Sequence, residues 1–263
     1  MIEGKVLLGV NNLIVQFGGL KAINDVSINV LEGEFIGLIG PNGAGKTTFF
    51  NSITGNIEAT SGEILFDNHK LNGKRSDQIS RLGISRTFQN IRLFNKMTAI
   101  ENISIGLHST PKYSTIEAVL RMPKVKNIEK ETKERAQYFL NILDLKEYEN
   151  HQASSLPYGL QRRLEIARAL ATSPKLLLLD EPAAGMNNDE CNELVDLLKR
   201  LHSELNLTII IIEHHIDVVM RLCEKVYVLN LGSLLAKGNP QQIQTNPDVI
   251  KAYLGERRKT SEQ

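Results

Sequence analysis

A glycine-rich segment directly after a short apolar run is the feature that most constrains this chain. Phe35–Ile39 has the length and composition of a buried strand, and residues 40–48 read Gly-Pro-Asn-Gly-Ala-Gly-Lys-Thr-Thr. This spacing matches the pattern G-x-x-x-x-G-K-[ST], in which glycines let the backbone wrap closely and point its amide groups at phosphate oxygens. A helix beginning near Lys46 adds its positive dipole end. The segment predicts a strand, a phosphate-binding loop and a helix in an α/β fold.

Two side chains of this loop are expected to act on the phosphates. Lys46 brings a positive charge to the β- and γ-phosphates of a nucleotide, and Thr47 offers a hydroxyl to Mg²⁺. A glycine-rich turn without a ligand is the alternative, but the flanking strand and helix favour nucleotide binding. The expected phosphate-binding residues are Gly40, Pro41, Asn42, Gly43, Ala44, Gly45, Lys46, Thr47 and Thr48.

A second buried strand is followed by two acidic residues. Leu176–Leu179 precedes Asp180 and Glu181, and ligands of open α/β sheets bind outside the carboxyl ends of the strands. We expect Asp180 to hold Mg²⁺, directly or through water, and Glu181 to polarise an attacking water. Alone, such a run is more typical of a strand that ends in a solvated acidic turn. Together with the phosphate loop it indicates nucleotide hydrolysis.

The rest of the chain alternates strands and helices. Val26–Val30 alternates apolar and polar residues, whereas Lys175–Leu179 and Thr208–Ile212 read as buried strands separated by a leucine-rich helix. Buried strands that alternate with helices indicate a parallel sheet covered on both faces. Residues 98–150 are rich in charged helix formers, and Ile128–Leu145 is the longest expected helix. The pattern predicts an α/β core, an N-terminal antiparallel β region and an inserted helical subdomain.

Charge and hydropathy exclude several kinds of partner. The 31 Lys and Arg against 30 Asp and Glu leave a net charge of +1, which gives no field for steering onto nucleic acid. The longest aliphatic runs, Leu176–Leu179 and Ile209–Ile212, fall far short of the ~20 apolar residues that span a bilayer. Residues 1–30 lack a secretion-signal pattern, and two cysteines fit a reducing cytosol. Any membrane role is expected to depend on a partner.

The order of the motifs across residues 7–255 resembles that of ATP-binding cassette (ABC) ATPases. Phe17 lies ahead of the phosphate loop, as an adenine-stacking aromatic does in that family, and Gln89 looks like its Q-loop glutamine. His214 follows a strand, as the family's switch histidine does. The resemblance implies that Gln89 coordinates Mg²⁺ or orients water and that His214 contacts the γ-phosphate. Taken singly, Phe17 also suits a strand core, and Gln89 and His214 suit surface positions.

The signature and D-loop segments of that family match less closely. Residues 156–163 occupy the signature position and keep its second glycine as Gly159, whose amide is implied to contact ATP of an opposite cassette. Residues 183–187 resemble the D-loop. The residues that depart from the usual patterns are Pro157, Tyr158 and Leu160 in the signature, Asn187 in the D-loop and His215 after the switch histidine. The resemblance therefore leaves open the finer contacts across the ATP interface.

Four segments narrow the resemblance to the cassette subunits of prokaryotic branched-chain amino-acid importers: residues 87–94, 156–159, 180–185 and 248–255. Such a subunit is an ATPase that works with a second cassette, identical or related, and with integral-membrane permease subunits. A periplasmic or extracellular solute-binding protein is an indirect partner. The implied location is the cytoplasmic face of the plasma membrane. A lipopolysaccharide-export cassette, a soluble ABC ATPase and a phosphotransferase remain as alternatives.

We expect residues 1–263 to form one ABC ATP-binding domain. In this division, residues 1–90 and 161–240 form the β subdomain and the α/β core. Residues 91–160 form the helical subdomain, and residues 241–263 form a C-terminal helix and tail.

Overall fold

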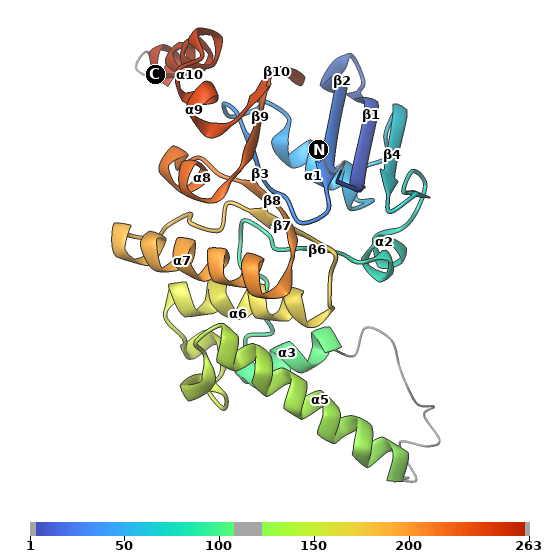
Figure 1. The fold of residues 1–263 in the computed structure, drawn as a ribbon, viewed down its shortest axis with the longest axis vertical. Helices are drawn as coiled ribbons and strands as arrows, with labels where there is room; N and C mark the ends of the chain where they lie inside the picture. The colour runs from blue at the N-terminus through green and yellow to red at the C-terminus, as the bar shows by residue number, and fades with distance from the viewer. Residues whose placement is uncertain (1–3, 108–122, 261–263) are drawn as a thin grey trace.

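The computed structural model describes residues 4–107 and 123–260, and the side chains of residues 123, 124 and 254–260 lie outside that description. Within these residues the strands form two sheets, shown in Figure 1. The first sheet contains β1 (Val6–Phe17), β2 (Leu20–Leu31), β4 (Ser61–Phe66) and β5 (His69–Lys70). The second contains β3 (Phe35–Ile39), β6 (Ile84–Arg86), β7 (Leu176–Asp180), β8 (Thr208–Ile212), β9 (Lys225–Asn230) and β10 (Ser233–Gly238).

The first sheet is antiparallel, with the order β2-β1-β4-β5. The predicted alternation in β2 is present, since Val26, Ile28 and Val30 are buried and the residues between them are exposed. In this register Val30 pairs with Leu8 and Ile28 with Val10. One face of the sheet therefore packs against the core and the other meets water.

The second sheet has the order β10-β9-β3-β8-β7-β6, and its strands are parallel except for β10. The order places β3, which leads into the phosphate loop, beside β8 and one strand away from β7. Strand β7 extends one residue past the predicted end because Asp180 pairs with Ile212 of β8. The carboxyl ends of β3, β7 and β8 thus meet at one edge. The predicted α/β fold class is confirmed.

The described helices are α1 (Lys46–Ile53), α2 (Ser76–Leu82), α3 (Ala99–Leu107), α5 (Pro123–Ile142), α6 (Tyr158–Ala171), α7 (Asn188–Leu205), α8 (Ile216–Leu222), α9 (Pro240–Gln244) and α10 (Pro247–Thr260). Short 3-10 helices cover Lys146–Tyr148 and Ala153–Ser155.

The longest helix, α5, differs from its predicted bounds of Ile128–Leu145. Within the described residues it extends from Pro123, five residues ahead of the predicted start. It ends at Ile142 because Asp144 adopts a left-handed φ of 58°. The expected boundary of the helical subdomain at residue 160 stays a prediction, since α6 packs against both α3 and the sheet.

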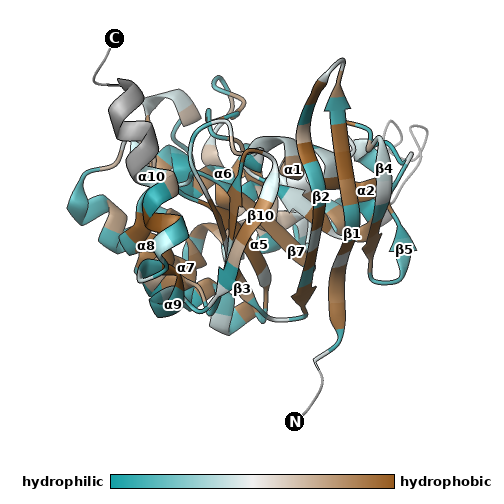
Figure 2. Cartoon of the chain, turned by 90° about the horizontal axis from the view of Figure 1, so that it is seen from above, coloured by the Kyte–Doolittle hydropathy of each residue, from teal (hydrophilic) through white to brown (hydrophobic). Residues whose placement is uncertain are grey.

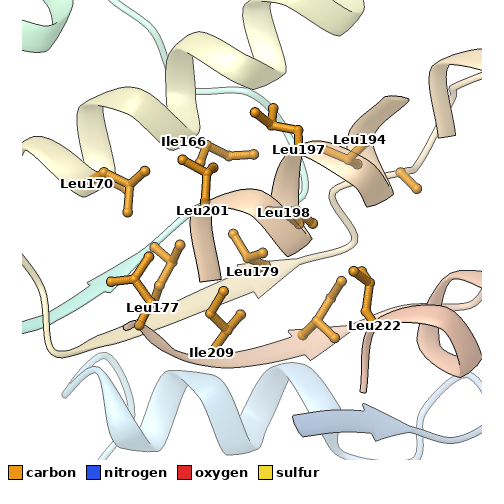
Figure 3. Close-up of a cluster of buried hydrophobic side chains, with 14 of the residues drawn as sticks. Ile166, Leu170, Leu177, Leu179, Leu194, Leu197, Leu198, Leu201, Ile209 and Leu222 are labelled. Atoms are coloured by element: carbon orange, nitrogen blue, oxygen red, sulfur yellow. The ribbon is translucent and has the colours of Figure 1, made fainter. Parts of the chain in front are cut away.

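Hydrophobic side chains fill both faces of the parallel sheet. Leu177 and Leu179 of β7 contact Ile166 and Leu170 of α6 and the leucines of α7, as Figure 3 shows. The alternate residues of β7 face the other way, toward α1 and the antiparallel sheet. Each such side chain contributes about 1.5–3 kcal/mol by burial. The sheet edge that carries the acidic residues is therefore held on both sides.

Figure 2 shows hydrophobic residues concentrated in the strands, with hydrophilic residues on many of the outer turns. Among the helices of residues 4–107 and 123–260, none has the length and apolar composition needed to cross a membrane.

Candidate nucleotide site

The phosphate loop is built from glycines that no other residue can replace without strain. Gly40 has φ 150° and Gly45 has φ 104°. A Cβ added at Gly40 would lie 2.1 Å from the carbonyl oxygen of Leu229, and one at Gly45 would lie 2.6 Å from that of Ala22. The loop can therefore follow its path only because both positions lack a side chain.

Lys46 begins helix α1 and folds back over the loop. Its side chain is buried, and Nζ donates to the carbonyl oxygens of Gly40 at 2.6 Å and Pro41 at 3.0 Å. Beside it lies a cavity of about 440 Å³. Its lining includes residues 42–48 of the loop together with Gln89, Glu181 and His214. The structure thus brings three expected site residues from separate parts of the sequence, Gln89, Glu181 and His214, to the cavity beside the phosphate loop.

Glu181 is the centre of a three-residue cluster in that cavity. Gln89 Nε2 donates to Glu181 Oε2 at 2.9 Å, and His214 Nε2 lies 2.8 Å from Glu181 Oε1. Glu181 has a left-handed φ of 48°, which costs a residue other than glycine about 1–3 kcal/mol. Its amide donates to the carbonyl oxygen of Ile212 at 2.9 Å. The carboxylate is therefore held from two sides, with lone pairs left for a further donor.

Asp180 is buried and paired with a residue that sequence reasoning did not assign to it. Arg86 Nη2 lies 2.7 Å from Asp180 Oδ2, and both side chains are almost fully buried. Arg86 Nη1 also donates to Asn51 Oδ1 at 2.7 Å, at the end of the helix that follows the loop. The ion pair keeps one oxygen of Asp180 on the guanidinium. A metal contact from Asp180 would therefore use its other oxygen or an intervening water.

Glu213 is a second buried carboxyl that the sequence did not point to. Its Oε1 accepts the amide of Ala183 at 2.8 Å, and its Oε2 accepts the amide of His214 at 3.1 Å. Burial raises the pKa of this carboxyl. Glu213 joins the segment after Glu181 to the segment of His214, so it fixes two of the residues that line the cavity.

Residues 23–184 match the family model described as ABC transporter, and residues 233–259 match one described as branched-chain amino acid ATP-binding cassette transporter. The high-affinity branched-chain amino acid transport ATP-binding protein LivG of Escherichia coli K12 is 48% identical over 250 residues, covering 95% of this chain and 98% of that protein. The chain belongs to the ABC transporter ATP-binding cassettes.

Solved cassettes share the fold. The crystal structure of the ADP conformation of an ATP-binding cassette of an ABC transporter superposes with a TM-score of 0.83 at 33% identity, covering 95% of this chain and 99% of that one. A cassette in a dimeric post-hydrolysis state with ADP and phosphate has a TM-score of 0.74 at 27% identity, covering 89% and 98% of the two chains. The family resemblance inferred from the motifs is confirmed.

Five of the expected site residues of this cassette are not among those that line its cavity: Gly40, Pro41 and Asp180, which lie within two residues of lining residues in the chain, and Phe17 and Gly159. Phe17 ends β1 with 51% of its surface exposed. Gly159 lies in the first turn of α6, where an added Cβ would meet only Glu190 Oε1, at 3.5 Å. Neither belongs to the lining of the cavity. Their assigned roles toward adenine and toward an opposite cassette stay predictions.

The unusual residues of the cassette's signature and D-loop have structural partners. Asn187 caps α7 by accepting the amide of Glu190 at 3.0 Å, a role that asparagine and aspartate fill equally well. The ring of Tyr158 lies beside Gly185 of the D-loop, 3.7 Å from where a Cβ on that glycine would be. Leu160 packs against the core beneath the sheet. Asn187, Tyr158 and Leu160 therefore each make structural contacts in this fold.

Proposed function

We propose that this chain binds and hydrolyses ATP as the cassette subunit of a branched-chain amino-acid importer. The observation that carries the ATPase assignment is that Glu181, held by Gln89 and His214, lines the same cavity as the phosphate loop. The match of residues 233–259 to the branched-chain family and the 48% identity to LivG support the substrate class.

The chain's own residues divide the work on ATP. Lys46 exchanges its contacts with loop carbonyls for the β- and γ-phosphates, and the amides of residues 42–48 hold the phosphate oxygens. Glu181 accepts the proton of the attacking water, and Gln89 keeps that carboxylate in place. His214 reaches the γ-phosphate by giving up its contact with Glu181. The steps of Lys46 and His214 each exchange a contact that exists in this structure.

Thr47 and Gln89 line the cavity, and Asp180 adjoins the lining residue Glu181 in the chain. Their side-chain oxygens suit Mg²⁺, which prefers oxygen ligands. The Thr47 hydroxyl, the remaining oxygen of Asp180 and the amide oxygen of Gln89 would hold it. Gln89 suits this role because its Nε2 is already used on Glu181, which leaves Oε1 for a cation. When bound, the ion neutralises charge that develops on the transferred phosphoryl group.

Adenine is proposed to stack on Phe17. The ring is half-exposed at the end of β1, so it can offer one face to a base. Stacking contributes about 1–3 kcal/mol per base, and it requires no hydrogen bond to the base edge.

A second cassette is proposed to complete the site. The N-terminus of α6, with Gly159, lies outside this chain's own cavity, and a homologous fold is known as a dimer with ADP and phosphate. An α6 terminus that faces the phosphate loop of a partner would supply amide donors and a positive dipole end to the γ-phosphate. ATP would then act as the ligand that stabilises the dimer.

A membrane permease is proposed to dock in a cavity of about 750 Å³ between the segment after Gln89 and helices α2, α3 and α6. Phe94 and Ile105 supply apolar contacts there, and Arg92 and Arg168 supply charge. A short helix of a partner fits such a groove. This contact would hold the cassette at the cytoplasmic face of the membrane, with the solute-binding protein on the far side.

The test is affinity purification of the full chain from detergent-solubilised membranes. The proposal expects two integral-membrane proteins to co-purify, and it expects MgATP hydrolysis that Lys46→Ala abolishes. A chain that purifies without membrane proteins would point to a soluble ABC ATPase instead. Hydrolysis that survives Lys46→Ala would remove the proposed nucleotide site.

A further inference from the structure

The most completely buried charged side chain of the described residues lies behind the candidate site and has no assigned role. Arg162 has none of its surface exposed. It lies on α6, one turn after Gly159, and its guanidinium contacts the backbone at Phe88 and Gln89. Burial of a charge is costly unless partners compensate it, so its contacts call for an explanation.

The contacts of Arg162 join α6 to the backbone of the segment that carries Gln89, here called the Q-loop (residues 87–94). Its Nη1 donates to the carbonyl oxygen of Phe88 at 2.7 Å, and its Nη2 donates to that of Gln89 at 2.7 Å. Nη1 also lies 2.7 Å from Glu165 Oε2. A planar guanidinium can hold two neighbouring carbonyls in a fixed geometry, which a single ammonium group cannot.

Two neighbours extend this connection. Glu165 is also buried, and its Oε1 accepts the amide of Arg92 at 3.1 Å, on the far side of Gln89. Tyr158, which replaces a signature glycine, receives a hydrogen bond from Arg162 Nη2 on its hydroxyl at 3.2 Å. Its ring lies beside Gly185 of the D-loop. The Q-loop backbone is thus bound to α6 before and after Gln89.

Helix α6, which carries Arg162, is packed against the parallel sheet. Ile166 and Leu170 of α6 point onto β7, as Figure 3 shows, and β7 ends in the acidic residues of the site. The side chain of Gln89 in turn donates to Glu181 at 2.9 Å. A continuous series of contacts therefore runs from α6 through Arg162 and the Gln89 backbone to the carboxylate.

We propose that Arg162 is a positioning residue that fixes Gln89 against helix α6, so that the Gln89 amide stays on Glu181 when α6 engages a second cassette. The inference rests on the proposed ATPase function. Arg162 itself touches neither ATP nor the reacting atoms. Its effect on turnover passes through Gln89, which distinguishes it from a residue that only stabilises the fold.

A double-mutant cycle tests this. Arg162→Lys keeps a positive charge beside Glu165 but cannot hold the Phe88 and Gln89 carbonyls together as the planar guanidinium does. In the complex of the full chain with its co-purifying subunits, we expect kcat to fall about tenfold with KM for ATP within about twofold. In a Gln89→Ala background, the same change should lower kcat by less than about twofold. Equal losses in both backgrounds, or no loss in either, would overturn the inference.

A second readout needs no nucleotide. Amide hydrogen exchange of residues 87–94 in the full chain should be about tenfold faster in Arg162→Lys, because its link to the Phe88 and Gln89 carbonyls is weakened. Exchange in α1 should not change. Arg200→Lys is the matched control, since Arg200 bonds the Ile142 carbonyl at 2.9 Å and Asp144 at 2.8 Å on the surface. Unchanged exchange at 87–94, or faster exchange throughout the chain, would contradict a positioning role.

Further variants keep the outcomes separate. If Arg162→Lys does not assemble with its partners, Arg162→Met combined with Glu165→Gln removes both buried charges together and is expected to give the same exchange pattern. Lys46→Ala in the same complex reports on the proposed function. ATPase that survives Lys46→Ala defeats that function. ATPase that Lys46→Ala abolishes but Arg162→Lys leaves at the wild-type level, with unchanged exchange, defeats the inference alone.

Discussion

Replacing Glu181 by glutamine changes the proton-accepting group and little else. The amide oxygen of the new glutamine at position 181 can still accept a hydrogen bond from Gln89 Nε2. Its amide nitrogen can donate to His214 Nε2 when the His214 ring carries its proton on Nδ1. Both contacts, now 2.9 and 2.8 Å, can therefore survive in Glu181→Gln. The cost falls on catalysis. General-base contributions of about 10²–10⁴ in rate correspond to about 2.7–5.5 kcal/mol of activation free energy.

The assay compares MgATP turnover and size-exclusion elution of the wild type and Glu181→Gln. We expect turnover to fall at least ~100-fold, with ATP affinity close to the wild-type value. Because ATP persists, a closed dimer should accumulate with MgATP, either of this chain alone or with its partner cassette. Glu193→Gln, on the exposed face of α7, is a control for removing one negative charge. A Glu181→Gln protein that turns over ATP within about threefold of the wild type would refute the assignment of the general base.

Three other substitutions test separate parts of the site. Lys46→Ala should lose most ATP binding in a nucleotide titration of the isolated chain, because the buried ammonium beside the loop is gone; equal affinities would remove the proposed site. Phe17→Ala should weaken ATP binding by about 1–3 kcal/mol in the same titration, and an unchanged Kd would place adenine elsewhere. Gly159→Asp has room in this chain, since an added Cβ meets only Glu190 at 3.5 Å. It should leave ATP binding by the isolated chain within about twofold but lower ATPase of the complex at least about tenfold, through repulsion of the γ-phosphate. Gly159→Asn, which lacks the charge, should lose less of the ATPase activity of the complex. Equal losses of activity in the two variants would argue against charge repulsion.

The parts of the site that could be predicted from sequence are those encoded within short segments. The strand, loop and helix over residues 35–53 formed as predicted, and β7 delivers Asp180 to the sheet edge. Each of these depends on local spacing and on strand burial. Asp180 pairs with Ile212 where β7 and β8 run side by side, and Glu181, the next residue along, contacts His214.

The contacts that support those residues could not be predicted because their partners are far apart in the chain. Arg86 meets Asp180 only because β6, a strand of three residues, pairs with β7. Glu213 follows an apolar strand and gave no signal that it would be buried. Arg162 falls within a charged stretch that reads equally well as a solvated helix face.

The central claim is that the cavity beside the phosphate loop hydrolyses ATP to energise import. The most direct measurement is steady-state MgATP turnover by the full chain purified with its membrane partners and reconstituted in vesicles with leucine, isoleucine or valine and the solute-binding protein. The claim predicts ATP hydrolysis that the amino acid stimulates and that both Lys46→Ala and Glu181→Gln abolish. An ATP turnover rate that is the same with and without the amino acid, or turnover that persists in either variant, would contradict the claim.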